Sequence, residues 1–183
     1  MHGTKEARTL SRDIDTAAIP YGDKIPLKAG STVYITQSLG GSFTAVTDMG
    51  YMVRIEGKDA DAIGEAPPPA PPSAEEQKEK SLQELAWDQL KTCYDPEIPV
   101  NMVDLGLVYS CEAAPVEGGG NKVSVRFTLT APGCGMGDYL KRDVETKIAA
   151  LPGVTETDVQ VVLEPVWDQS RMSDAARLQL GLM

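Results

Sequence analysis

The residues of this sequence that could do chemistry gather around one cysteine. Cys134 lies in the run Thr128-Leu-Thr-Ala-Pro-Gly-Cys134-Gly-Met-Gly-Asp138, between a segment of alternating apolar residues and a segment with helical spacing. We expect this run to turn from a strand into a helix. The free amides and the dipole at a helix amino terminus stabilise an anion, so they lower the pKa of a thiol there. The sequence therefore predicts a reactive thiolate at Cys134, left uncovered by Gly133 and Gly135. The alternative is a small buried cysteine in a tight turn.

The other two cysteines are typical of core residues. Cys93 and Cys111 are distant from Cys134 in sequence, no C-x-x-C is present, and an odd count argues against a disulfide framework. Cys93 falls on the apolar stripe of a predicted helix, and Cys111 falls inside a predicted strand. We expect both side chains to be buried.

Several function classes are excluded or disfavoured by composition. A cysteine protease needs a histidine base, and the one histidine is His2. The glycine spacing around Cys134 matches neither the dinucleotide fingerprint nor the Walker pattern. The net charge of −10 is concentrated in residues 81–183, which carry −7, so a nucleic acid is not the expected partner. This charge suits basic protein partners or a plain solvated surface.

The expected compartment is the cytoplasm. The first fifteen residues mix both charge signs without an apolar stretch, which is not the pattern of a secretory signal. No apolar run reaches the length of a membrane span, so we expect no membrane association.

A proline-rich segment divides the chain. Five of the thirteen prolines fall within six positions of residues 65–80, which we interpret as a semi-rigid linker. Residues 1–64 contain four short β-branched or aromatic segments separated by turn residues, and they predict a small all-β module. Residues 81–183 form the second predicted domain.

The second domain has the pattern of a two-layer α+β fold. Ser81 and Glu84 form a capping box before a helix that should run to about Tyr94. Strands are predicted near 107–113, 122–130 and 158–164, and helices near 138–150 and between Ser173 and Gly181. The predicted order is α-β-β-α-β-α.

Four motifs in this domain resemble a known family. They are Asp95-Pro-Glu97-Ile-Pro-Val-Asn101-Met-Val-Asp104-Leu-Gly-Leu-Val-Tyr109, Leu129-Thr-Ala-Pro-Gly-Cys134, Leu151-Pro-Gly-Val154, and Met172-Ser173 with Ala176-Arg-Leu-Gln-Leu-Gly181. Their types and order resemble the metal-sulfur cluster biosynthesis domain over about residues 81–183. Two positions differ: Gly135 replaces the family's usual proline, which should loosen the first helical turn, and Glu164-Pro-Val-Trp167 replaces its Asp-Pro-Pro-Trp.

The resemblance implies a role in iron-sulfur protein maturation and no classical catalysis. The family's reactive cysteine falls on Cys134, its acidic positions on Asp95, Glu97 and Asp104, and its polar positions before the loop on Thr128 and Thr130. The implied cofactor is a transient iron-sulfur cluster. One thiol cannot hold such a cluster alone, since clusters ordinarily take four ligands. A homodimer would supply a second thiolate, and an assembly scaffold or client protein could supply more; oxygen ligands from the acidic positions or Glu164 are less suited.

Three hypotheses therefore stand at the level of sequence. The first is a cluster carrier or client adaptor that uses the Cys134 thiolate. The second is a non-catalytic interaction adaptor in which Cys134 is structural. The third is a subunit of an oxygenase assembly, resembling a relative of this domain in phenylacetate breakdown, although the β module and linker argue against it.

Overall fold

The chain forms two compact units, which are described separately. The structure is a computed structural model that describes residues 6–68, 74–133 and 135–182. The units are Met1–Pro71 and Pro72–Met183. Cys134 lies outside the described residues.

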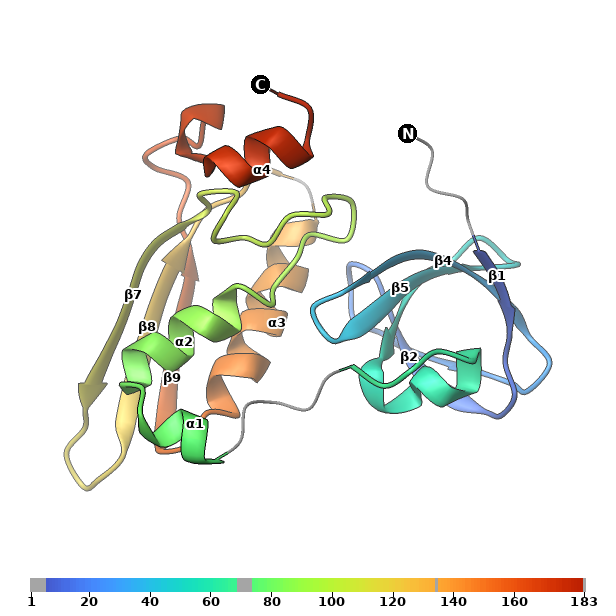
Figure 1. Cartoon of the computed structure of the whole chain (residues 1–183), viewed down its shortest axis with the longest axis horizontal. Helices are drawn as coiled ribbons and strands as arrows, with labels where there is room; N and C mark the ends of the chain where they lie inside the picture. Colours follow the sequence, from blue (N-terminus) through green and yellow to red (C-terminus); the bar gives the residue numbers. More distant parts are fainter. Residues whose placement is uncertain (1–5, 69–73, 134, 183) are drawn as a thin grey trace. The chain divides into compact units, whose positions relative to one another are not determined.

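The first unit is a single antiparallel sheet of six strands. In chain order its elements are β1 Glu6–Thr9, β2 Ile14–Ala18, β3 Lys24–Leu27, β4 Thr32–Leu39, β5 Ser42–Thr47, β6 Met52–Glu56 and the 3-10 helix η1 Gly57–Ile63. The strand order is β1-β4-β5-β6-β2-β3 (Figure 1). The predicted all-β module is confirmed, but the predicted number of four strands is too low. Strands β1 and β2 were not predicted, because their charged and small residues hide the alternation.

Apolar residues from strands β2 to β6 share one core. It includes Val33, Val53 and Ile55, which are fully buried, and η1 contributes Ile63. Pro26 lies in β3, an edge strand, where its missing N–H costs no ladder bond.

Residues at both ends of the predicted linker are part of ordered structure. Those at its start contact the first unit, and those near its end form a helix. Glu65 accepts a hydrogen bond of 2.8 Å from the Arg8 guanidinium in β1. Pro68 packs on Gly57, where an added Cβ would lie 2.5 Å from its Cγ. On the other side, residues Ala74–Lys78 form the short helix α1. Residues 65–68 are therefore held against the first unit.

The second unit has two layers. Its further elements are α2 Leu82–Leu90, β7 Val108–Pro115, β8 Asn121–Phe127, α3 Met136–Ala149, β9 Val154–Val161, the 3-10 helix η2 Gln169–Arg171 and α4 Asp174–Gln179. The sheet order is β7-β8-β9, with β7 antiparallel and β9 parallel to β8. Helices α2 and α3 lie against the same face of the sheet (Figure 1). The predicted α+β class and α-β-β-α-β-α order are confirmed.

Alternation along the strands explains why the helices cover only one face. Val123, Val125 and Phe127 of β8 are fully buried, whereas Arg126 between them is exposed. The Ser81–Glu84 capping box is present at the start of α2, as predicted. Leu140, Val144 and Ile148 form the buried stripe of α3.

Several predicted boundaries differ from the structure, and strand β9 ends at Val161 instead of near Glu164. Helix α2 ends at Leu90 instead of near Tyr94, because the chain turns there and Cys93 N–H donates to the Leu90 carbonyl. Strand β8 ends at Phe127. Strand β9 begins at Val154, four residues before the predicted start, because its polar residues pair with β8 beyond the apolar segment on which the prediction relied.

Candidate functional site

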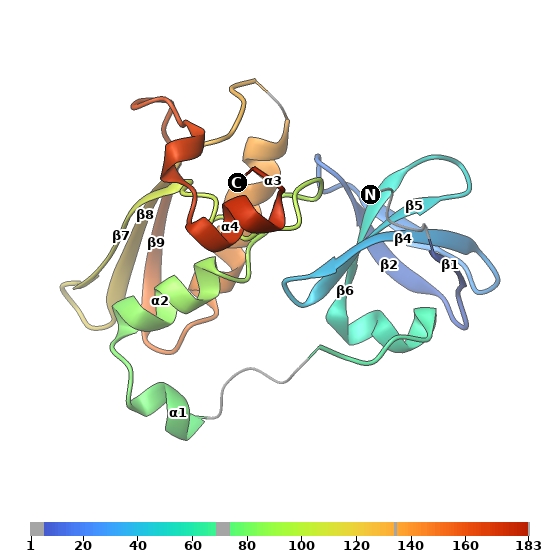
Figure 2. The same cartoon turned by 45° about the horizontal axis from the view of Figure 1, so that its top comes forward.

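Three segments that carry the sequence motifs meet at one end of the second unit. We name residues 94–107 the acidic loop, residues 128–135 the glycine loop and residues 162–182 the C-terminal strap. Thr128 N–H donates to the Leu107 carbonyl (2.9 Å), and Val162 N–H donates to the Phe127 carbonyl (2.8 Å). The first bond ties the start of the glycine loop to the end of the acidic loop, and the second ties the start of the strap to the end of β8, directly before the glycine loop. Figure 2 shows the acidic loop, α4 and the start of α3 at the same end of the unit.

The glycine loop is anchored at its start and exposed further on. Thr128 and Leu129 are 2% and 8% exposed, and Thr130 is half-buried. Gly133 is exposed, has a φ of 87°, and has no atom within 4 Å of an added Cβ. This φ lies in the left-handed region that favours glycine. The described part of the loop therefore leads from the core into open space.

Helix α3 begins immediately after the glycine loop. Its first residue is Met136 and its N-cap is Gly135, which offers no side-chain cap. Gly137 is buried in the first turn, and a Cβ there would lie 2.9 Å from Cδ1 of Leu129. A side chain at position 137 would therefore require the Leu129 side chain to shift. The predicted strand-to-helix connection is observed around Cys134, while Cys134 itself lies outside the described residues.

The acidic loop brings three predicted site residues into one segment. Asp95 Oδ1 accepts from the Glu97 N–H (2.8 Å), and Asp104 Oδ2 accepts from the Asn101 carboxamide (2.6 Å). Asn101 forms a bridge with Tyr94, so the two halves of the loop lie side by side. Burial raises the pKa of the Asp95 carboxyl, and the Glu97 charge adds to this rise, whereas the Glu97 N–H opposes it.

The C-terminal strap holds the acidic loop from outside. The Trp167 indole donates to the Leu105 carbonyl (2.8 Å), and Ser173 N–H donates to the Asp104 carbonyl (2.9 Å). The Tyr109 hydroxyl donates to the Pro165 carbonyl, and the Arg171 guanidinium lies 4.6 Å from the centre of the Tyr109 ring. The strap therefore fixes the backbone of the loop that carries Asp104.

Gly106 makes this close contact sterically feasible. Its φ is 72°, and an added Cβ would lie 2.2 Å from the Arg171 carbonyl oxygen. Neither Gly106 nor Trp167 was predicted to be a positioning residue. The glycine in the Asp-Leu-Gly-Leu run and the single tryptophan of residues 162–182 are the signals that could have identified them.

The remaining cysteines are poor candidates for thiol chemistry. Cys93 and Cys111 are 0% and 3% exposed, as expected for core residues. Burial raises the pKa of the Cys111 thiol to about 11, and the Glu112 charge adds to the rise. Cys93 Sγ donates to the Gln89 carbonyl at 3.5 Å. Neither thiol meets the requirement of an accessible thiolate.

Comparison with known proteins assigns the second unit. A family model described as iron-sulfur cluster assembly protein matches residues 84–161. A Porphyromonas gingivalis protein named Fe-S protein maturation auxiliary factor is 42% identical over 94 residues, which are 51% of this chain and 86% of that protein. The chain belongs to the iron-sulfur cluster assembly protein family.

Two further family relatives match most of their own length. The Staphylococcus aureus Fe-S protein maturation auxiliary factor SufT is 38% identical over 48% of this chain and 96% of its own. The Bacillus subtilis Fe-S protein maturation auxiliary factor YitW is 35% identical over 57% of this chain and 98% of its own. Each of these matches therefore leaves more than two fifths of this family member unmatched.

The structure brings some of the predicted site residues together and places Glu164 in a different segment. Asp95, Glu97 and Asp104 share the acidic loop, and Thr128 links that loop to the glycine loop. Glu164 is exposed at the start of the strap. Within residues 6–68, 74–133 and 135–182, no three His, Cys, Asp or Glu side chains are grouped closely enough to hold a metal ion. The same described ranges contain no helix long and apolar enough to cross a membrane.

Proposed function

We propose that this chain takes part in the maturation of iron-sulfur proteins, as a cluster carrier or client adaptor that acts through the Cys134 thiolate. The observation that carries the proposal is the family membership of the unit in which the glycine loop leads into α3. Three relatives are named Fe-S protein maturation auxiliary factors, which supports an auxiliary role without substrate turnover.

The surroundings of the glycine loop support the choice of Cys134 over the other thiols. Cys93 and Cys111 are enclosed in the core. Gly133 is exposed with open space around it, and Gly135 precedes the free amides of the first turn of α3. These amides favour an anion near the helix start. A thiolate that becomes available here can bind iron or the sulfur of another protein.

The cluster is cargo in this proposal, and the chain supplies only part of its ligands. Clusters ordinarily need four ligands, mostly cysteine sulfur. The remaining thiolates would come from an assembly scaffold, a client protein or a second copy of the chain. Asp95, Glu97 and Asp104 provide oxygen atoms, which suit hard cations better than iron-sulfur clusters. We therefore infer that the acidic loop contributes shape and charge to the surface that a partner contacts at this end of the unit.

Anaerobic reconstitution with iron and sulfide tests the thiol role. We expect cluster absorbance, or maturation of an iron-sulfur enzyme in cells that depend on this chain, to be lost in Cys134→Ala. Cys111→Ala is the matched control, because it removes a buried thiol from the same unit. The proposed role fails if Cys134→Ala retains both cluster binding and client maturation.

The alternative hypothesis, a non-catalytic interaction adaptor with a structural Cys134, predicts a different experimental result. Residues 81–183 carry a net charge of −7, which suits a basic partner. If partner capture survives Cys134→Ala and weakens steeply with salt, the chain acts by electrostatic docking and Cys134 has a structural role.

A further inference from the structure

The outer edge of β7 carries backbone groups that are available for another strand. Within the described residues, β7 pairs with β8 alone and forms one edge of the sheet. Val116 N–H donates to the Gly120 carbonyl in the connecting hairpin, so this pair is hydrogen-bonded. Bonded pairs alternate along an antiparallel ladder. Ala114 and Glu112 therefore exchange bonds with β8, whereas Cys111 and Ala113 direct their N–H and C=O groups away from it.

The position of Pro115 agrees with this assignment. Pro115 has the same parity as Cys111 and Ala113, so its missing N–H would point outward and removes no bond to β8. The free edge thus begins at Pro115 and continues along the strand. An extended peptide can pair with such an edge by β-augmentation.

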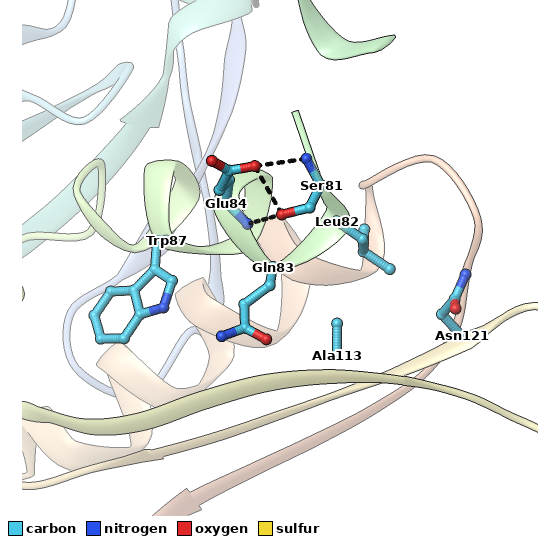
Figure 3. Close-up of a pocket in the computed structure, with 7 residues that line it drawn as sticks. All are labelled: Ser81, Leu82, Gln83, Glu84, Trp87, Ala113 and Asn121. Atoms are coloured by element: carbon cyan, nitrogen blue, oxygen red, sulfur yellow. Dashed lines mark hydrogen bonds between the residues drawn. The ribbon is translucent and has the colours of Figure 1, made fainter. Parts of the chain in front are cut away.

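A hollow lies beside this edge, between β7 and the first turns of α2. It has a volume of about 390 Å³ and is lined by Ser81, Leu82, Gln83, Glu84, Trp87, Ala113 and Asn121 (Figure 3). The side chain of Gln83 extends toward Ala113, and the indole of Trp87 stands beside it (Figure 3). Asn121 begins β8, whereas the glycine loop follows its end. The hollow is therefore separated from the glycine loop by the length of a strand.

Polar groups in the hollow remain available to a ligand. Among the described residues, neither the Gln83 carboxamide nor the Trp87 indole N–H makes a hydrogen bond. Ser81 and Glu84 are occupied by the capping box. Leu82 and Trp87 are only partly buried. The hollow thus offers an apolar wall and free donors to a side chain that enters it.

Charge indicates what kind of strand would pair here. Glu112 is exposed and lies on the face of β7 that the helices leave open. If two copies paired about Glu112, the two carboxylates would lie directly opposite each other, which is destabilising. A lysine or arginine opposite Glu112 would be favourable. Residues on either side of that base would point toward the helices, one of them into the hollow, and should be apolar.

We propose that β7 is a docking edge for an extended segment of a partner protein in which a basic residue is flanked by apolar residues. The backbone of Cys111 and Ala113 would bind the segment, Glu112 would pair with its basic residue, and the hollow would receive one apolar side chain. This deepens the proposed function by defining a partner surface, and it rests on that function only in treating the partner as part of the maturation machinery.

A pair of synthetic peptides tests the proposal on the full-length chain. The probe is acetyl-Ser-Thr-Leu-Lys-Phe-Thr-Ser-amide, and its partner has glutamate in place of lysine. We expect the lysine peptide to shift the amide NMR signals of Cys111 and Ala113. It should bind about fivefold more tightly than the glutamate peptide, as expected for a favourable cross-strand charge pair. In Glu112→Lys this preference should reverse.

Two variants distinguish strand pairing at the edge of β7 from nonspecific binding of the peptide. Ala113→Pro removes an outward N–H and should abolish binding, while Glu117→Pro places the same substitution at the second position of the exposed hairpin turn beyond β7, where proline is favoured, and should not. Circular dichroism verifies that both variants are folded. The proposal is wrong if the lysine peptide leaves the Cys111 and Ala113 amides unchanged at millimolar concentration, or if Glu112→Lys does not alter the preference. Sedimentation that shows a dimer with these amides protected would assign the edge to a second copy and would also overturn it. None of these readouts involves Cys134, so a failure here is distinct from a failure of the thiol role.

Discussion

The contact between Gly106 and the strap allows a quantitative test of how the acidic loop is held. Replacing Gly106 with alanine places a Cβ 2.2 Å from the Arg171 carbonyl oxygen, in a backbone with a φ of 72°. The left-handed conformation costs an alanine about 1–2 kcal/mol. Relieving the overlap costs about 1–3 kcal/mol more, by analogy with overpacked sites. We therefore expect Gly106→Ala to lower the free energy of unfolding by about 2–5 kcal/mol.

Gly181→Ala is a matched control for the backbone cost. Gly181 has a φ of 69° and lies in the same unit, but nothing lies within 4 Å of an added Cβ. It should lose only the conformational cost of about 1–2 kcal/mol. The difference between the two variants isolates the contact between the acidic loop and the strap.

Tryptophan fluorescence during urea unfolding provides the measurement. Both tryptophans, Trp87 and Trp167, belong to the second unit, so the signal reports on that unit alone. Trp167 donates to the Leu105 carbonyl beside Gly106, and its native emission should shift in Gly106→Ala as the strap is displaced. Equal losses in the two variants, with unchanged emission, would refute the inference that the strap presses on Gly106.

Three further predictions address ionisable groups and thiols. The folded-state pKa of Asp95 is raised above its unfolded value of about 3.9, so its ionisation opposes folding as pH rises through the folded value. Asp95→Asn should therefore be more stable than wild type at pH 7, with the difference lost below about pH 3.9 in urea titrations. Lys147→Met should cost about 3–5 kcal/mol in urea unfolding, because it breaks a buried ion pair in which Nζ lies 3.1 Å from the Asp143 carboxylate. Iodoacetamide at pH 8 should label Cys134 in the folded chain and spare Cys111, as read by mass spectrometry after digestion.

Each of these predictions has a discriminating control. Lys141→Met removes an exposed partner of Glu145 at 3.9 Å and should cost less than about 1 kcal/mol. If Lys147→Met lowered the free energy of unfolding by as little as Lys141→Met does, water would be replacing the buried cation. A stability gain in Asp95→Asn that persists at low pH would show that packing, not ionisation, is its origin. Labelling of Cys111 at the rate of a free thiol would contradict its burial.

Local sequence patterns predicted the elements that surround the candidate site. The Ser81–Glu84 capping box and the alternation of Val123, Val125 and Phe127 depend on neighbours three or two residues apart, and both are present. The glycine run between Leu129 and α3 likewise predicted a strand-to-helix connection. The motifs also identified the family, because type and order of residues suffice for that. The assignment of Cys134 as the functional thiol stays a prediction.

Contacts between segments distant in sequence were decided by the tertiary structure. Trp167 reaches Leu105 across 62 positions, and Gln179 reaches Pro99 across 80. The polar start of β9 becomes a strand only because β8 provides a parallel partner. The need for a residue without a Cβ at position 106 likewise follows from where Arg171 passes. Local spacing determines which helices and strands can form, whereas the strap and the free edge of β7 depend on which segments the packed core brings together.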